Sequence, residues 1–262
     1  MLEIGFSADG KPLEAFTSGG GIEVRIPYTL QTGVSRHSLV AASAGQQGRM
    51  DIVRSSKYET ETGELVFAMK QPGIYGVAIF ASAFTDLGDY GWAKNSVDAL
   101  FASRIIDGIS QEHFAPGAAG SRAEFLKMAM EAFGLVEPGK AASFTDVRAG
   151  EWYSDSIASA QKLHIISGYE DGSFGPAQAV TREEMAVLVL RILKAAGVDL
   201  QLAKGGTDFQ DGTEIAGYAA DAVNSLNEAG LIQGQDGGRF APKSPTTRAE
   251  AAVLITRILG LE

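Results

Sequence analysis

The sequence predicts an α+β multidomain protein, with a small β-rich N-terminal unit followed by a mainly helical part. Three observations predict it: period-two alternation near the N-terminus, three copies of one motif pattern after residue 83, and a strongly apolar run behind the same motif in the copies. We expect a β-rich unit over 1–83 and three repeats over 84–143, 144–208 and 209–262.

Short strands are predicted in the first 83 residues. Residues 22–26 (IEVRI) alternate apolar and polar side chains, as a half-buried strand does. Residues 58–67 are typical of a hairpin that turns at Thr62-Gly63, and residues 76–80 are typical of a last strand. Residues 37–47 show no clear pattern and are expected to form a loop.

The three repeats share landmarks at matching positions. Successive copies of the same glycine and of the same arginine lie 60 and then 66 residues apart, which chance does not produce. These landmarks are Gly108, Gly168 and Gly234, and Arg122, Arg182 and Arg248. Each copy therefore represents one structural unit used three times.

Each repeat begins with a turn and a short helix. A Phe-x-Asp turn, which contains Asp86, Asp146 or Asp211, leads to an aromatic residue and then to an amphipathic helix, expected over 154–163 in the second copy. The aspartates are better explained as turn or cap residues than as ligands. The landmark glycine follows the short helix, and we expect this glycine to have a positive φ.

A second, longer helix follows a Phe-x-Pro loop in each repeat. Ser/Thr-Arg-x-Glu has the spacing of a capping box, in which hydroxyl and carboxylate satisfy free backbone N–H groups. The helix behind it is too apolar to stand alone in water, so three of them should bury one another in a central bundle, with Leu126, Leu188 and Leu254 pointing inward.

The combination F-T-D…W…I-I-x-G-Y-x-D-G-S-F-x-P…T-R-E-E resembles the S-layer homology domain, which usually occurs in three tandem copies. The resemblance implies a pseudo-threefold spindle around three central helices. It also implies non-covalent anchoring of an exported protein to secondary cell-wall polysaccharide associated with peptidoglycan, commonly one that carries pyruvylated N-acetylmannosamine. In such domains the arginine of the motif lines the groove that receives the acidic sugar. The first 83 residues more weakly resemble the last strands of a β-sandwich-like module.

The repeats depart from the pattern to different degrees. The second copy keeps the loop 168–174 (GYEDGSF) intact, the first lacks its Asp-Gly pair, and the third carries the aspartate one position early. We therefore expect unequal grooves, and we expect the one that uses Arg182 and the loop 168–174 to be the strongest.

Two interpretations of the arginines stay open. A cation at the first helical position opposes the helix dipole and calls for an anion. That anion is either a ligand carboxylate, as the resemblance favours, or an internal acid such as Asp146 or Asp155.

The remaining candidates also have two interpretations. The repeat aromatics either stack on sugar rings or hold the turn, and the Asp-Gly pair either binds a sugar hydroxyl or only shapes its turn. The candidate ligand-binding residues are Arg122, Arg182, Arg248, Asp171, Gly172, Gly168, Gly108, Gly234, Trp92, Trp152 and Tyr218.

Composition excludes several function classes. A net charge of −10 and a pI near 4.9 disfavour nucleic acid and anionic membranes as partners. The chain has no cysteine, and no apolar run reaches the roughly 18–20 residues that insert into a membrane. The N-terminus lacks the pattern of a signal peptide, so the chain is either a cytosolic protein or a fragment of a longer one. Because the β-rich module resembles only the last strands of a β-sandwich, we interpret the chain as a fragment of a larger exported, extracellular protein.

No chemistry is indicated by the motifs. His37, His113 and His164 are isolated from one another, and no nucleophile, Walker or dinucleotide motif is present, so we expect no enzyme activity, metal or cofactor. The alternative to a wall anchor is a surface-protein interaction or lattice-forming domain with weak or lost glycan binding. The oligomeric state is not indicated by the sequence.

Overall fold

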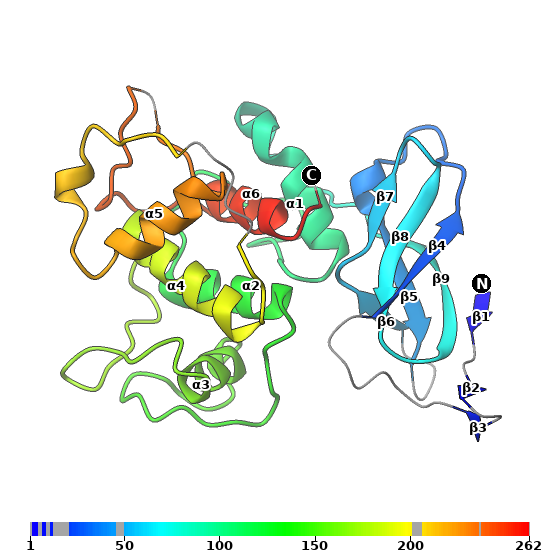
Figure 1. Cartoon of the computed structure of the whole chain (residues 1–262), viewed down its shortest axis with the longest axis horizontal. Coiled ribbons are helices and arrows are strands. Elements are labelled where there is room, and N and C mark those ends of the chain that lie inside the picture. The colour runs from blue at the N-terminus through cyan, green and yellow to red at the C-terminus, as the bar shows by residue number, and fades with distance from the viewer. Residues whose placement is uncertain are drawn as a thin grey trace. The chain divides into compact units, whose positions relative to one another are not determined.

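The computed structural model describes residues 2–4, 7–8, 11–12, 21–45, 50–200, 206–235 and 237–261. The chain divides into two compact units, one formed by Met1–Ala115 with Leu259–Glu262 and the other by Pro116–Ile258. The described residues contain both strands and helices, as expected for an α+β protein (Figure 1). None of the helices in these ranges is long and apolar enough to cross a bilayer.

The first unit contains two small antiparallel sheets. One has the order β1-β9-β5-β6 and the other the order β4-β8-β7, and a further short pair joins β2 to β3. The strands are β1 (Leu2–Ile4), β2 (Ser7–Ala8), β3 (Lys11–Pro12), β4 (Ile22–Pro27), β5 (Leu39–Ala44), β6 (Met50–Val53), β7 (Lys57–Glu59), β8 (Glu64–Met69) and β9 (Gly73–Ile79).

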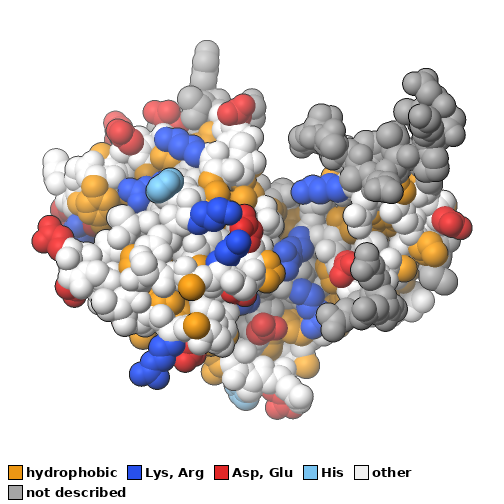
Figure 2. Space-filling model, turned by 90° about the horizontal axis from the view of Figure 1, so that it is seen from below, with side chains coloured by type: hydrophobic (Ala, Val, Ile, Leu, Met, Phe, Trp, Pro, Cys, Tyr) orange, Lys and Arg blue, Asp and Glu red, His pale blue; other side chains and the backbone are white. Residues whose placement is uncertain are grey.

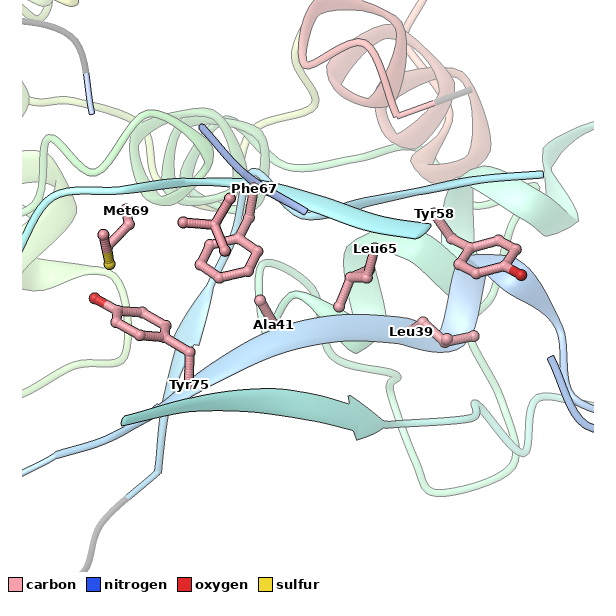
Figure 3. Packing of buried hydrophobic residues seen from close by; sticks show 8 residues of the cluster. Leu39, Ala41, Tyr58, Leu65, Phe67, Met69 and Tyr75 are labelled. Carbon is pink, nitrogen blue, oxygen red and sulfur yellow. The ribbon is translucent and has the colours of Figure 1, made fainter. Parts of the chain in front are cut away.

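Apolar side chains from both sheets form one core. Figure 3 shows Leu65 and Phe67 of β8 facing Leu39 and Ala41 of β5, and all four are buried. Phe67 packs on Tyr75 with ring centroids 5.3 Å apart, and buried tyrosine hydroxyls reach backbone carbonyls. Packing of the two sheets on each other therefore stabilises this part of the chain.

The strand predictions for this unit are confirmed with one exception. The strand at 22–26, the hairpin through Gly63 (φ +70°) and the last strand are all present. The loop expected over 37–47 is wrong, because Leu39–Ala44 forms β5 between β9 and β6; Gln46 and Gln47 lie outside the described residues. The first four residues of β5 are buried, so its sequence lacks the polar alternation that reveals a half-exposed strand.

The first unit also includes the helix α1 (Gly91–Ala102), preceded by the short 3₁₀ helix η3 (Gly88–Tyr90). The helix α1 contacts β5 and the 3₁₀ helix η1 (Arg36–Ser38). Asp98 of α1 is buried and accepts hydrogen bonds from Ser82 and Lys94, both at 2.6 Å. Residues 84–115 thus belong to the same compact unit as the β-rich residues.

The second unit is helical. Its elements are α2 (Arg122–Ala132), α3 (Ser154–Lys162), α4 (Arg182–Ala195), η4 (Gly212–Glu214), α5 (Ala220–Glu228) and α6 (Arg248–Ile258). The helix α2 contacts α3, α4 and α6, and α4 contacts α5 (Figure 1). The predicted starts of α2, α4 and α6 at the repeated arginines are confirmed, and Leu126, Leu188 and Leu254 are buried.

The capping boxes are confirmed in all three copies. In α4 the Thr181 hydroxyl accepts from the backbone N–H of Glu184, and the Glu184 carboxylate accepts from the N–H of Thr181. The boxes of α2 and α6 use Ser121 with Glu124 and Thr247 with Glu250. Each box satisfies two backbone donors that the first helical turn leaves free.

The expectation about the landmark glycines is only partly right. Of the three, only Gly168 has a positive φ (+72°). The left-handed residue that follows the short helix is instead Arg104, His164 or Gly230. A Cβ on Gly108 or Gly168 would lie 2.4 Å from the phenylalanine of the Phe-x-Asp turn, so close packing explains these two glycines.

Gly168→Ala is expected to destabilise the protein more than Gly230→Ala does. Both residues have φ near +70°, which costs an L residue about 1–2 kcal/mol. Only at Gly168 does a Cβ also clash with the Phe144 ring, which adds about 1–3 kcal/mol. Chemical denaturation of both variants measures the difference, and equal losses of stability would contradict the packing argument.

Candidate functional site

The three repeated arginines are buried at the first position of their helices. Their exposed fractions are 9% for Arg122, 6% for Arg182 and 8% for Arg248. A solvated surface cation would be largely exposed. Each arginine must therefore be neutralised by a nearby anion, because an unpaired buried charge is strongly unfavourable.

The anion is the capping-box glutamate of another repeat. Arg122 Nη1 lies 2.8 Å from Glu184 Oε1, Arg182 Nη1 lies 3.1 Å from Glu250 Oε1, and Arg248 Nη1 pairs with Glu124 Oε1. Neither Asp146 nor Asp155, the acids considered from the sequence, takes this role. The three pairs form a closed cycle from the first copy to the second, the second to the third, and the third to the first.

Each of these glutamates acts at two places at once. The Oε2 atom of Glu184 accepts the backbone N–H of Thr181 at 2.9 Å, while Oε1 accepts from Arg122. The glutamates of the other boxes divide their oxygens in the same way. Sequence reasoning used only the oxygen that caps the helix and missed the second, which binds across repeats.

Backbone hydrogen bonds close the same cycle. The N–H of Val180 donates to the carbonyl of Gly120, that of Gly120 to Thr246 and that of Thr246 to Val180, at 2.9–3.0 Å. We call this set the backbone ring. The N–H groups of the three arginines also donate to carbonyls of another repeat: Arg122 to Gln178, Arg182 to Ser244 and Arg248 to Ala118.

The intact loop 168–174 contacts Arg122, and the expectation that it shares a site with Arg182 is wrong. Arg122 Nε donates to the carbonyl of Phe174 at 3.1 Å, and its guanidinium lies over the Tyr169 and Phe174 rings at 5.1 and 5.0 Å. We define the Arg122 site as Arg122 with Glu184, Tyr169, Phe174 and Gln178. Tyr169 is held there by a 2.8 Å hydrogen bond from its hydroxyl to Gln178.

The Arg182 site is built from the third repeat's loop and comprises Arg182, Glu250, Gln233 and Phe240. Arg182 Nε donates to the carbonyl of Phe240 at 2.7 Å and Nη2 to that of Gln233 at 3.2 Å. All three nitrogens of Arg182 are therefore engaged. Arg122 differs, because its Nη2 has no hydrogen-bond partner among the residues that the structure describes.

The aspartates of the Phe-x-Asp turns are structural, as expected. Asp146 accepts from the backbone N–H groups of Phe174 and Gly175, both at 2.8 Å, and Asp86 and Asp211 each hold the corresponding pair in their own repeat. Burial alone would raise the pKa of Asp86 and of Asp211, but these hydrogen bonds outweigh it and lower both.

Asp171 is engaged within its own turn. Its Oδ1 accepts from the backbone N–H and hydroxyl of Ser173 at 2.9 and 2.6 Å, which lowers the pKa of Asp171. Gly172 has a φ of +81° in the same turn. These contacts are those of the turn-forming alternative.

The repeat aromatics project from the surface. Trp92, Trp152 and Tyr218 are 58%, 55% and 61% exposed. Trp152 contacts Tyr153 edge-on with centroids 5.0 Å apart, and Trp92 lies 6.3 Å from Tyr90. Tyr218 instead donates its hydroxyl to Glu183 at 2.9 Å.

The face in Figure 2 carries both acidic and basic side chains, with hydrophobic atoms scattered between them wherever residues are described.

Within the described ranges, no group of three or more His, Asp or Glu side chains is placed to hold a metal ion. Of the histidines, His113 Nδ1 lies 3.2 Å from Ser110 Oγ, and His37 Nε2 accepts from Arg36. Burial lowers the pKa of His37.

The fold and the site together define a repeat protein whose copies are linked in a cycle by arginines at helix N-termini. The S-layer homology domain model matches three times, at residues 83–126, 143–186 and 208–252, which together cover half of the chain. The chain therefore belongs to the S-layer homology domain family, whose members are non-catalytic modules of S-layer and other cell-surface proteins.

Relatives include both enzymes and S-layer proteins. The chain is 30% identical to an amylopullulanase of Thermoanaerobacterium thermosulfurigenes, and the alignment covers 78% of this chain and 11% of the relative. It is 32% identical to exoglucanase XynX of Acetivibrio thermocellus (75% and 18%) and 29% identical to the S-layer protein sap of Bacillus anthracis (74% and 23%). The chain thus spans less than a quarter of the length of each of these relatives.

Arg182→Ala is expected to destabilise the protein by about 3 kcal/mol, because it removes the cation paired with Glu250 and the donor to two backbone carbonyls. The exposed Arg148, which has no partner among described residues, provides the control, and Arg148→Ala should change stability by less than about 0.5 kcal/mol. Urea denaturation measures both. A loss as small as the control's would show that the cycle of ion pairs contributes little.

The protein is expected to lose stability below about pH 4. Asp86, Asp211 and Glu183 have lower pKa values in the folded chain than their ordinary values near 4. Their stabilisation is therefore complete above that pH and is lost as the pH falls through the lowered folded values. Thermal unfolding from pH 7 to 2 measures it. Asp211→Asn should weaken this dependence, whereas substitution of the exposed Asp89 by Asn should leave it unchanged.

Proposed function

We propose that this chain is a non-catalytic anchoring module that binds secondary cell-wall polysaccharide associated with peptidoglycan. In this role it holds an exported protein on the bacterial surface, outside the cell. Membership of the S-layer homology family supports the proposal, as does the similarity to the S-layer protein sap of Bacillus anthracis. The proposed determinant on the polymer is an anionic sugar, such as a pyruvylated amino sugar.

For the architecture we propose that α2, α4 and α6 form the central three-helix bundle of a pseudo-threefold spindle. The contacts of α2 with both other helices support this arrangement. The cyclic ion pairs and the backbone ring support it too, because each relation recurs from copy to copy and returns to the first. A cycle of three equivalent contacts is what a threefold arrangement requires.

The observation that carries the binding proposal is the state of Arg122. Its Nη1 pairs with the Glu184 carboxylate and its Nε donates to the carbonyl of Phe174, so the side chain is fixed. Its Nη2 keeps donor capacity for a ligand. A fixed guanidinium with a free donor is well suited to a carboxylate, and exposed aromatics such as Trp152 offer a face for a sugar ring. We therefore propose the Arg122 site as the main site for an acidic sugar.

The other candidates keep subsidiary roles in this proposal. Arg182 and Arg248 are the corresponding arginines of the other repeats, and Trp92 and Tyr218 are the corresponding aromatics. Gly108, Gly168, Gly234, Asp171 and Gly172 shape the loops. Since the chain carries a net charge of −10, a polyanion is not attracted at long range and recognition depends on these local donors.

The chain is expected to bind purified wall sacculi and to lose that binding after the secondary polymer is chemically removed. Equal binding before and after removal would contradict the proposal and favour an interaction with surface proteins.

Calorimetry with a defined pyruvylated N-acetylmannosamine glycoside should show affinity reduced about ten- to a hundredfold by Arg122→Lys, which removes the planar fork. Arg148→Ala is the binding control, and circular dichroism checks that each variant is folded.

A further inference from the structure

The three copies differ at one set of equivalent positions. The second residue of the apolar helix is Ala123, Glu183 or Ala249, and the residue after the Phe-x-Pro loop is Gly117, Ala177 or Lys243. The repeat aromatic that belongs with these positions is tryptophan in two copies and Tyr218 in the third. Glutamate, lysine and tyrosine thus occur together, and only where α4 meets the third repeat.

These residues form one cluster, which we call the Glu183 cluster: Glu183, Ala216, Tyr218 and Lys243. Glu183 Oε1 accepts from the Tyr218 hydroxyl at 2.9 Å and pairs with Lys243 Nζ, and Oε2 accepts the backbone N–H of Ala216 at 3.1 Å. The Glu183 side chain is only 3% exposed, whereas that of Lys243 is 62% exposed.

The donors of this cluster suit any carboxylate. An ammonium, a phenol hydroxyl and a backbone amide converge on the two oxygens of one carboxyl group, and charge-assisted hydrogen bonds of this kind are strong. Although burial would raise the pKa of Glu183, hydrogen bonds from Lys243, Ala216 and Tyr218 lower it, so the group is ionised at neutral pH. The chain therefore supplies its own carboxylate to these donors.

The Glu183 cluster lies at the same junction as the Arg182 site. The N–H of Glu183 donates to the carbonyl of Pro242, next to Lys243, while Arg182 Nε donates to that of Phe240. All three Arg182 nitrogens are engaged there. Among the described residues, the nitrogens of Arg182 and the Tyr218 and Ala216 donors are thus already engaged within the chain, and Lys243 is paired with Glu183.

We infer that Glu183 is the specificity-determining residue that closes the Arg182 site to the carboxylate of an external sugar, and that this carboxylate would bind Lys243, Tyr218 and the Ala216 amide if Glu183 were absent. The inference rests on the proposed function, since it names which copy takes the acidic sugar. At the Arg122 site the equivalent residues are Ala123 and Ala177, which carry no carboxylate and no competing cation.

Calorimetry with the pyruvylated N-acetylmannosamine glycoside tests the inference through the number of ligands bound per chain. Glu183→Ala should add one site to the wild-type number. Glu183→Gln keeps the volume and the contact with Tyr218, so it should leave the number unchanged. The reciprocal variant, Ala123→Glu with Ala177→Lys and Trp152→Tyr, builds the cluster into the Arg122 site and should remove one site.

The outcomes separate this inference from the proposed function. If wild type binds and Glu183→Ala adds no site, the inference is overturned while the proposed function stands. If wild type does not bind but Glu183→Ala does, the inference stands and the Arg122 proposal fails; binding by neither overturns both. Should Glu183→Ala not fold, the reciprocal variant decides, because retention of its Arg122-site binding would overturn the inference.

Discussion

The buried arginine–glutamate pairs at the helix N-termini are the interaction on which the helical unit depends. A guanidinium at the first helical position opposes the helix dipole and is taken out of water, so it is tolerated only with a fixed anion beside it. The capping glutamate of another repeat provides that anion, as Glu184 does for Arg122. The same glutamate also caps the N-terminus of its own helix. One side chain therefore both stabilises the start of that helix and attaches it to another repeat. No copy completes its ion pair alone.

The same constraint decides how much donor capacity each copy retains for a ligand. An arginine that must hold a carboxylate and a loop carbonyl has one nitrogen left. In the second copy, the backbone carbonyl of Gln233 accepts from this nitrogen of Arg182, whereas Nη2 of Arg122 in the first copy has no partner among the described residues. Copies with nearly the same motif thus differ in chemistry through the backbone and side-chain groups around each arginine. Glu183, which is buried against Lys243 and Tyr218, increases this difference.

Local features were predictable from the sequence. The capping boxes and the hairpin at Gly63 depend on contacts between residues a few positions apart, so spacing alone indicates them. Predictions failed where packing removed the usual signal. The strand β5 is mostly buried and shows no alternation, and the landmark glycine Gly108 is needed because Phe84 packs against it, without any positive φ. Composition and motif give no sign of such contacts.

The sequence by itself determined that one unit is repeated three times, where its apolar helices begin and which residues close them, because these features follow from propensity and from hydrogen bonds within one turn. Only the tertiary structure decided which arginine meets which glutamate and which loop. Arg122 lies near Glu184 and the loop 168–174 because the backbone ring joins each copy to the following one. A carboxylate has two oxygens, and a local motif accounts for only one. Which arginine pairs with the second oxygen depends on the order in which the three copies contact one another.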